Sequence, residues 1–373
     1  MTGTAPPRAT RPGSGPRPSG RGAVLIGAGI LLSRLLGLVR QRLFAAYLGV
    51  SDAADVFTAA FRIPNFLQNL FGEGVLSASF VPVYAQLHER GDDAARRELA
   101  GAVLSLLLLV TAVVVLLGIL AAPALTALFV PGYSGEKLAL AVRLVRILFP
   151  GAALLVLAAW SLGVLNSHRR FFLAYASAAL WNVAMIATLV AFGPSRGEDD
   201  LVVLLAWGSV AGSLLQFVAQ LPRVMQLLGG VRLVLRSRSA EVATVVRNFV
   251  PVFVGRGVAQ ISGLIDTVIA SLLGTGAQAT LGYAQMLYML PVSLFGMSVS
   301  AAELPEMSSA TGSSEQVAEH VRTRLGTGLR QIAFFVIPCA VAFLLLGDAI
   351  IRALFESGKF GPTDTMFAWG ILA

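Results

Sequence analysis

Nine apolar stretches, each long enough to cross a lipid bilayer as a helix, constrain the fold of this chain more than any other feature. A membrane-spanning helix needs about 20 predominantly apolar residues. A tenth stretch begins near Met366 and is too short to cross before Ala373, which indicates a chain truncated inside a span. The sequence therefore predicts an all-α, polytopic transmembrane helical bundle, with spans at residues 23–48, 55–87, 99–123, 138–165, 171–192, 200–222, 245–272, 279–302 and 329–355.

The overall composition agrees with a membrane protein. Apolar residues make up 56% of the 373 residues, charged residues 13%, and the mean hydropathy is +0.77, whereas soluble domains carry about 25% charged residues. This excludes a disordered chain, a small secreted disulfide scaffold and a soluble nucleic-acid binder. The lone Cys339 and three scattered histidines offer no metal-ligand spacing. We expect no metal, no cofactor and no nucleic-acid partner.

The distribution of basic residues predicts the orientation. Residues 1–22 are rich in Pro, Gly, Arg and Ser, cannot bury a core, and are expected to form a disordered basic cytoplasmic tail. With this tail inside, 15 arginines of the tail and loops are cytoplasmic, and only Lys137, Arg196 and Lys359 lie outside. Because basic residues favour the cytoplasmic side, we predict a multi-pass protein with a cytoplasmic N-terminus.

A weak internal repeat divides the chain. The pattern Phe-Gly, Ser-Ala, Val-Pro at residues 71–82 recurs as Phe-Gly, Ser-Ala, Leu-Pro at residues 295–305. The alternative is chance matching among small residues in apolar helices. Since an even number of spans separates the copies, a true repeat would give two parallel pseudo-repeat lobes around a central cavity. These would be an N-lobe of six transmembrane helices at 23–240 and an incomplete C-lobe at 241–373.

Several charged residues lie deep inside the predicted spans, where each costs about 2.5–3.5 kcal/mol on insertion scales. Others have a simpler explanation: three arginines lie near predicted helix ends, and Asp55 opens its span, where an acid is favourable. Arg34 lies about 17 Å from the start of its span, which is the bilayer midplane. The deep set is Arg34, Arg40, Arg62, Glu73, Arg256 and Asp266.

Buried arginines facing a watery cavity indicate an anionic substrate, because a guanidinium matches a phosphate group bidentately. Arg34 and Arg40 fall about 120° apart on an ideal helix, so a shared site needs a bend at Gly37 or a wide cavity. Alternatively, Arg62 and Glu73 pair with charges of the first span. The sequence contains no Walker A, HExxH or GxSxG motif, so we expect no enzymatic activity.

The first two spans carry a specific resemblance. Residues 33–82 read Ser-Arg-Leu-Leu-Gly-Leu-Val-Arg, then Asp-Ala-Ala-Asp-Val-Phe-Thr-Ala-Ala-Phe-Arg-Ile-Pro-Asn, then Phe-Gly-Glu-Gly and Ser-Ala-Ser-Phe-Val-Pro. This stretch resembles the MurJ (MviN) lipid II flippases, and looser matches follow at 165–166, 220–222, 260–262 and 358–360. The resemblance implies a fourteen-helix, two-lobed fold shared with MATE exporters and polysaccharide flippases. It also implies transport of the lipid-linked peptidoglycan precursor, lipid II, across the bacterial inner membrane by alternating access, in cell-wall biogenesis.

Carried over position by position, Arg34, Arg40 and Asp55 match residues that the family needs. Arg62 matches a basic position and Glu73 an acidic one. Two departures concern positions where the family commonly has arginine and this chain has Gln68 and Met286. Conversely, Arg256 and Asp266 stand where the family usually has uncharged residues. Our hypothesis is that Arg256 supplies the cavity charge that Gln68 and Met286 lack.

The sequence thus predicts a flippase with a cationic central cavity. The expected substrate-binding residues are Arg34, Arg40, Arg62 and Arg256; Asp55, Glu73 and Asp266 are expected in gating or charge pairing. The implied partners are lipid II, the bilayer and cell-wall synthesis proteins. A polysaccharide-lipid flippase or MATE-like exporter is one alternative, although a drug exporter would favour acidic cavity residues. A non-transporting membrane scaffold or pseudo-transporter is another.

Overall fold

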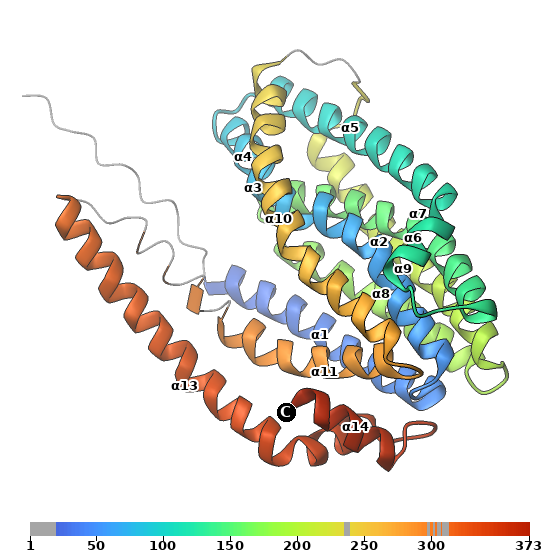
Figure 1. The fold of residues 1–373 in the computed structure, drawn as a ribbon. Helices are drawn as coiled ribbons and strands as arrows, with labels where there is room; N and C mark the ends of the chain where they lie inside the picture. Colours follow the sequence, from blue (N-terminus) through green and yellow to red (C-terminus); the bar gives the residue numbers. More distant parts are fainter. Residues whose placement is uncertain (1–19, 235–238, 297–298, 301–302, 304–306, 308–312) are drawn as a thin grey trace, which may run out of the picture.

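The fold is a bundle of long α-helices, described here by a computed structural model (Figure 1). The structure describes residues 20–234, 239–296, 299–300, 303, 307 and 313–373. In these residues no β-strand forms, apart from one isolated bridge between Ser357 and Phe360. This confirms the predicted all-α class. Most of the predicted tail, and part of the second repeat copy, lie outside the described residues.

The helices follow the predicted spans closely. Six described helices are long and apolar enough to cross a membrane, namely α5, α7, α8, α9, α10 and α13. The bounds are α1 Gly20–Leu48, α2 Asp52–Phe71, α3 Glu73–Ser79, α4 Val81–Glu89, α5 Asp93–Leu120, α6 Ala122–Phe129, α7 Gly135–Ser167, α8 Phe171–Phe192, α9 Glu198–Leu228, α10 Ala240–Leu272, α11 Ala277–Pro291, the π-helical turn η1 Val292–Gly296, α13 Ser314–Phe355 and α14 Pro362–Leu372.

Two predicted elements differ from the structure. The single span expected at 55–87 is three consecutive helices, α2, α3 and α4. The first break lies at Gly72, whose backbone is extended (φ −84°, ψ −151°), and the second precedes Pro82 in the first turn of α4. The span expected at 279–302 contains α11 and then the π-helical turn η1; residues 299–300 are again helical, and residues 297–298 and 301–302 lie outside the described part of the chain. Glycine and proline therefore interrupt helices that hydropathy alone joins.

The helices run alternately between two ends of the bundle. One end holds residues 49–51, 130–134, 193–197, 273–276 and 356–361, and we call it the sealed end. The opposite end holds residues 90–92, 168–170 and 229–234, and we call it the open end.

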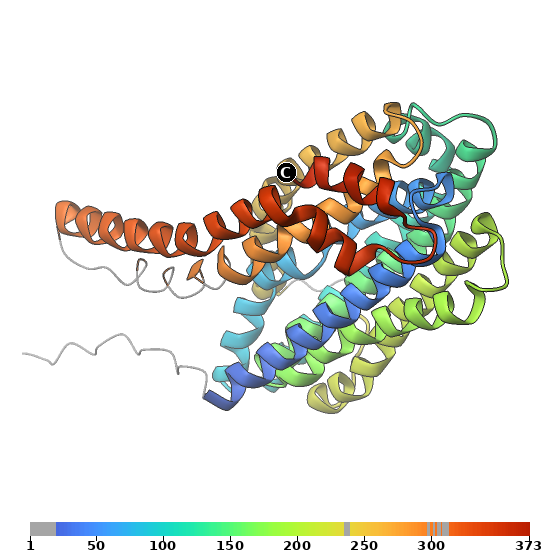
Figure 2. The same ribbon diagram turned by 90° about the horizontal axis from the view of Figure 1, so that it is seen from below.

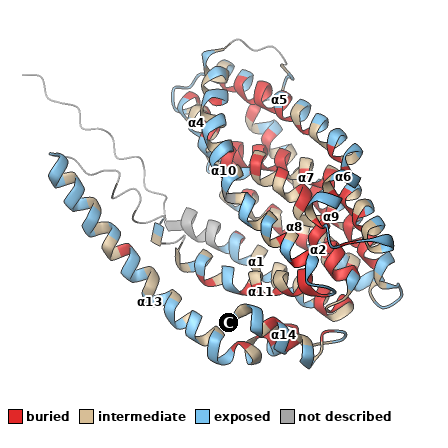
Figure 3. Cartoon of the chain, viewed as in Figure 1, coloured by how far each residue is buried: buried red, intermediate tan, exposed pale blue. Residues whose placement is uncertain are grey.

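Helix α7 is the centre of the bundle. It packs against α2, α5 and α9, while α1 and α9 both pack against α8, and burial is concentrated on these helices (Figure 3). In contrast, the N-terminal half of α13 stands apart from the other helices in two perpendicular views (Figures 1 and 2). Apolar side chains on the outer surface are widely exposed, such as Leu120 at 68% and Phe334 at 73%. These surfaces match a protein whose solvent is lipid.

Candidate functional site

A cavity of about 580 Å³ lies inside the bundle. Helices α1, α2, α3, α7, α8, α9 and α11 contribute to its wall. Three of the predicted site residues line it: Arg34, Arg40 and Glu73. The two positions at which this chain departs from the family's arginines, Gln68 and Met286, line it as well.

Arg34 and Arg40 reach the same cavity from one helix. Helix α1 runs through Gly37 without interruption, and the width of the cavity accommodates both side chains. The Nη1 of Arg34 donates to the Ser293 hydroxyl at 2.9 Å. The Arg40 guanidinium lies 4.8 Å from the centroid of the Trp181 ring, and its Nε is buried without a hydrogen-bond partner in the described chain. Both cations retain donors for an anionic ligand.

Carboxamides surround the two arginines. Asn65, Gln68, Asn182 and Gln216 all line the cavity. Asn182 donates to a backbone carbonyl of α1 at 3.3 Å, whereas the side chains of the other three make no hydrogen bond within the described part of the chain. Unpaired amides can both donate and accept, so this wall can bind neutral polar groups such as hydroxyls and amides.

Arg62 lies outside the set of lining residues. It projects from α2 between α10 and α11, where Nη1 donates to the Gly263 carbonyl at 3.3 Å and to the Thr267 hydroxyl at 3.2 Å. Its Nη2 donates to Gln285 of α11. Asp266 of α10 contributes favourable charge near Arg62 but forms no ion pair with it among the described residues. Arg62 thus links α2 to α10 and α11 through its hydrogen bonds.

Arg256 also lies outside the lining set. Its guanidinium packs on the break between α2 and α3, since a Cβ added at Gly74 would lie 2.0 Å from Arg256 Nη2. It interacts electrostatically with Glu73, which does line the cavity. The cavity wall itself therefore carries two guanidinium groups and one carboxylate, and Arg256 lies behind Glu73 rather than in the wall.

Asp55 joins three segments at the sealed end. Its side chain is fully buried and accepts hydrogen bonds from the backbone N–H groups of Gly276 at 2.6 Å and Ala279 at 2.8 Å. The Nζ of Lys137 lies 3.3 Å from Asp55 and 2.5 Å from the more exposed Asp52. Asp55 lies in the first turn of α2, as expected from the sequence, and its side chain also caps the N-terminus of α11.

Backbone contacts tie further loops together at this end. Gly358 packs on the backbone of α1, where an added Cβ would lie 2.3 Å from a carbonyl oxygen. Three hydrogen bonds join segments that are distant in sequence: Tyr283 hydroxyl to Gly49 oxygen at 2.9 Å, Lys359 N–H to Ala46 oxygen at 2.9 Å, and Gly132 N–H to Ser271 hydroxyl at 3.3 Å.

Aromatic side chains fill the space between the cavity and these loops. Two of them, Phe44 and Phe57, lie one helical turn beyond the last lining residues of α1 and α2. Across the whole set, the ring centroids of neighbouring side chains are 5.2 to 6.3 Å apart, and none is more than 5% exposed. The cluster is Phe44, Phe57, Tyr283, Phe355 and Phe360. The cavity is therefore closed on the side of the sealed end.

A histidine pair lies at the open end. The rings of His88 and His168 are 4.2 Å apart, Tyr84 hydroxyl is 3.0 Å from His168 Nε2, and Arg96 Nη1 is 2.7 Å from His88 Nδ1. Burial, followed by the neighbouring His88, Arg96 and Arg170, lowers the pKa of His168 to about 4. A positive charge on the His168 ring is therefore unfavourable at this position.

Some residues of the site were missed at the level of sequence. Lys137 counted only as one of three outside charges, and the partners of Arg62 were not identified. Trp181 and Asn182 offered a signal, because they are an aromatic and a polar residue side by side within an otherwise apolar span. Residues so distant in sequence come together only through the fold.

Comparisons with known proteins agree on one family. A family model described as lipid II flippase MurJ matches residues 44–373. The "Probable lipid II flippase MurJ" of Haemophilus influenzae is 36% identical over 351 residues, covering 91% of this chain and 68% of that protein. The lipid II flippase MurJ of Burkholderia cenocepacia is 34% identical over 345 residues, covering 91% and 66%. The chain thus spans about two thirds of the length of these curated relatives.

Solved structures give the same result for the fold. A lipid II flippase MurJ in an inward closed conformation matches with a TM-score of 0.78 at 28% identity, covering 94% of this chain and 71% of that one. An inward-facing MATE multidrug transporter of the MOP superfamily matches with a TM-score of 0.67 at 17% identity, covering 94% and 79%. The second match concerns the fold alone.

Proposed function

Because this chain belongs to the family of MurJ lipid II flippases, we propose that it moves lipid II across the cytoplasmic membrane by alternating access. The observation that carries this proposal is the cavity that Arg34 and Arg40 share inside a membrane-spanning bundle. Guanidinium groups are costly at that depth, and an anionic head group that enters the cavity offsets this cost.

The lining residues suit the two parts of the lipid II head group. Arg34 and Arg40 bind the pyrophosphate through charge-assisted hydrogen bonds. Asn65, Gln68 and Gln216 offer their unpaired carboxamides to the hydroxyl and amide groups of the sugars. Gln68 and Met286, in place of arginines, leave a cavity that relies on neutral contacts as much as on charge. The lipid tail stays in the bilayer between helices.

The charge pairs have a role in gating. Asp55 with Lys137 holds the sealed end closed, while Glu73 and Asp266 balance the nearby charges of Arg256 and Arg62 electrostatically. With the N-terminus in the cytoplasm, the sealed end faces outward and the cavity faces the cytoplasm. An N-lobe at 23–240 and a C-lobe at 241–373 then rock against each other, so that the Asp55 contacts break when the cavity opens outward.

The remaining assignments follow from this proposal. The chain is a transporter without catalytic chemistry or a cofactor, it resides in the inner membrane, and it supplies lipid II to cell-wall synthesis proteins. Arg256 contributes to the binding site through Glu73 rather than by contact with substrate.

Complementation of a strain depleted of its own lipid II flippase tests the proposal. The gene that encodes this chain should restore growth, and Arg34→Gln should abolish the rescue at equal membrane levels. The matched control is Arg143→Gln, since Arg143 is an exposed arginine on α7 away from the cavity. Rescue by Arg34→Gln as strong as that of the unchanged chain would overturn the binding role of the cavity and favour a scaffold.

A further inference from the structure

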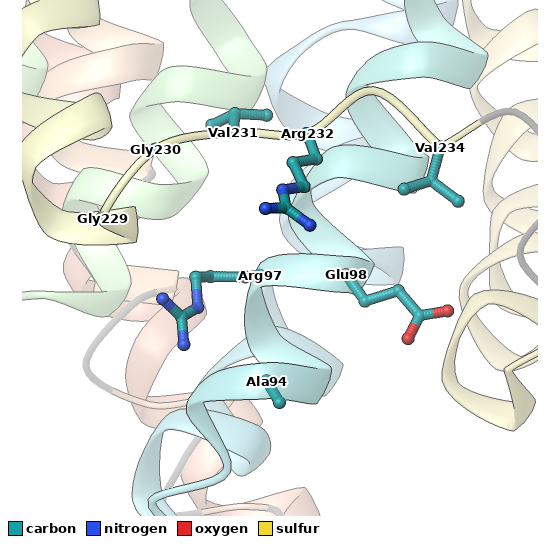
Figure 4. Close-up of a pocket in the computed structure, with 8 residues that line it drawn as sticks. All are labelled: Ala94, Arg97, Glu98, Gly229, Gly230, Val231, Arg232 and Val234. Atoms are coloured by element: carbon teal, nitrogen blue, oxygen red, sulfur yellow. The ribbon is translucent and has the colours of Figure 1, made fainter.

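A second hollow lies at the open end, away from the central cavity. It has a volume of about 630 Å³ and is formed by the first turns of α5 and by the segment 229–234 that follows α9. Figure 4 shows two guanidinium groups beside it, from Arg97 on α5 and Arg232 on the segment, while the carboxylate of Glu98 points to the other side. Neither arginine forms an ion pair within the described residues.

The wall of this hollow is fixed by one face of α5. A Cβ added at Gly101 would lie 2.1 Å from the Arg232 carbonyl oxygen, so the segment rests directly on the helix backbone. One turn further on, the Ser105 hydroxyl accepts a hydrogen bond from Val234 N–H at 2.9 Å. Arg97 is oriented by a bond from its Nε to the Asp93 carbonyl at 3.0 Å. The two arginines are therefore held near each other by α5 rather than gathered by chance.

Two like charges held at one hollow favour an anion that bridges them. The position of the hollow indicates its source. Helix α9 ends at Leu228, immediately before the segment, and the apolar run of α5 begins at Leu99. The hollow thus lies at the boundary between hydrocarbon and water, where the phosphates of membrane lipids are found.

The same face of α5 continues as a surface for acyl chains. Arg97, Gly101, Ser105, Leu108 and Leu116 fall within an arc of about 100° on a helix of 3.6 residues per turn. The two leucines are 36% and 59% exposed. A lipid with its phosphate at the arginines can therefore lay a chain along these leucines. A soluble phosphate compound gains nothing from that apolar stripe.

We propose that Arg97 and Arg232 form a binding site for the phosphodiester of an anionic membrane phospholipid, separate from the transport cavity. The site does not depend on the proposed cargo, and it gives the open end a fixed contact with the headgroup layer of its leaflet.

Binding of dioleoylphosphatidylglycerol to the purified chain in a neutral detergent tests the proposal, with dioleoylphosphatidylcholine as the reference lipid. Arg97→Gln and Arg232→Gln should each weaken binding of the anionic lipid roughly tenfold, the loss expected for one charge-assisted hydrogen bond. Arg223→Gln is the matched control, because Arg223 is a half-buried arginine of the same end whose Nη1 already donates to Gln226 Oε1 at 2.9 Å.

A fourth variant tests whether lipid binding needs the packing of segment 229–234 on α5 or only the presence of positive charge at this end. Gly101→Ala keeps both arginines but forces the segment off α5, and it should also weaken binding of the anionic lipid. Equal losses in Arg223→Gln, or no loss in Arg97→Gln and Arg232→Gln, would overturn the site. Inorganic phosphate that binds as tightly as the lipid would overturn its assignment to a membrane phospholipid.

Discussion

The two ends of this bundle are built differently. At the sealed end, loops far apart in sequence share hydrogen bonds, and Asp55 is fully buried between α2, α11 and Lys137. Toward the open end, the first half of α10 and the N-terminal half of α13 expose apolar side chains, such as Val254 at 57% and Leu329 at 57%. The arginine-lined cavity lies between these ends, and the aromatic cluster separates it from the first.

This difference teaches which contacts must change during transport. A carrier with one central site needs each end to close in turn. The sealed end depends on a few buried, directional contacts, which can break as a set. The open end has apolar surfaces that can face lipid in this conformation. Other helices can cover the same surfaces in the conformation in which the sealed end opens. The comparison therefore predicts large mutational effects at the sealed end and small ones at the open end.

The largest effect is expected at Asp55. Asp55→Ala leaves the buried N–H groups of Gly276 and Ala279 without their acceptor and leaves Lys137 with only the exposed Asp52. Loss of one partner from a buried ion pair costs about 3–5 kcal/mol. Thermal unfolding in detergent should show this loss. The control is Asp52→Ala, which removes the exposed partner of the same lysine (58% exposed side chain) and should cost less than about 1 kcal/mol. Similar losses in both variants would contradict the account.

An intermediate effect is expected from a matched pair of glycines. Gly358 and Gly91 both have left-handed φ angles, +58° and +72°. An added Cβ at Gly358 meets a backbone oxygen of α1, whereas at Gly91 it meets nothing within 4 Å. Gly91→Ala should cost about 1–2 kcal/mol from backbone strain alone, and Gly358→Ala about 3 kcal/mol once overpacking is added. Equal unfolding free energies for the two variants would show that the sealed end is not tightly packed.

The smallest effect concerns His168 at the open end. Because its pKa is lowered from 6.5 to about 4, the folded chain keeps this ring neutral while the unfolded chain takes up a proton. Its contribution is fully present above pH 6.5 and is lost as the pH falls toward 4. His168→Asn should flatten this part of the stability profile in detergent. An unchanged slope between pH 6.5 and 4 would argue against a neutral, buried ring.

Hydropathy predicted the helices well, because a membrane demands long apolar helices with paired backbone groups. It joined α2, α3 and α4, since the breaks at Gly72 and before Pro82 do not alter the apolar run. Arg34 and Arg40 were identified because charge inside a span is conspicuous. The partners of Asp55 and Arg62 were not, because Lys137 lies 82 residues from Asp55 and the other partners lie more than 200 residues away in sequence. No local pattern reports such contacts.

The central claim is that the cavity opens to the cytoplasm while the Asp55 contacts close the outer side. Ala178, a small lining residue, is a suitable position for a single cysteine in a Cys339→Ser background. A membrane-impermeant thiol reagent should label Ala178→Cys from the cytoplasmic side of vesicles and not from the outside. Adding Asp55→Ala should create labelling from the outside. Labelling of Ala178→Cys from the outside alone would contradict both the orientation and the seal.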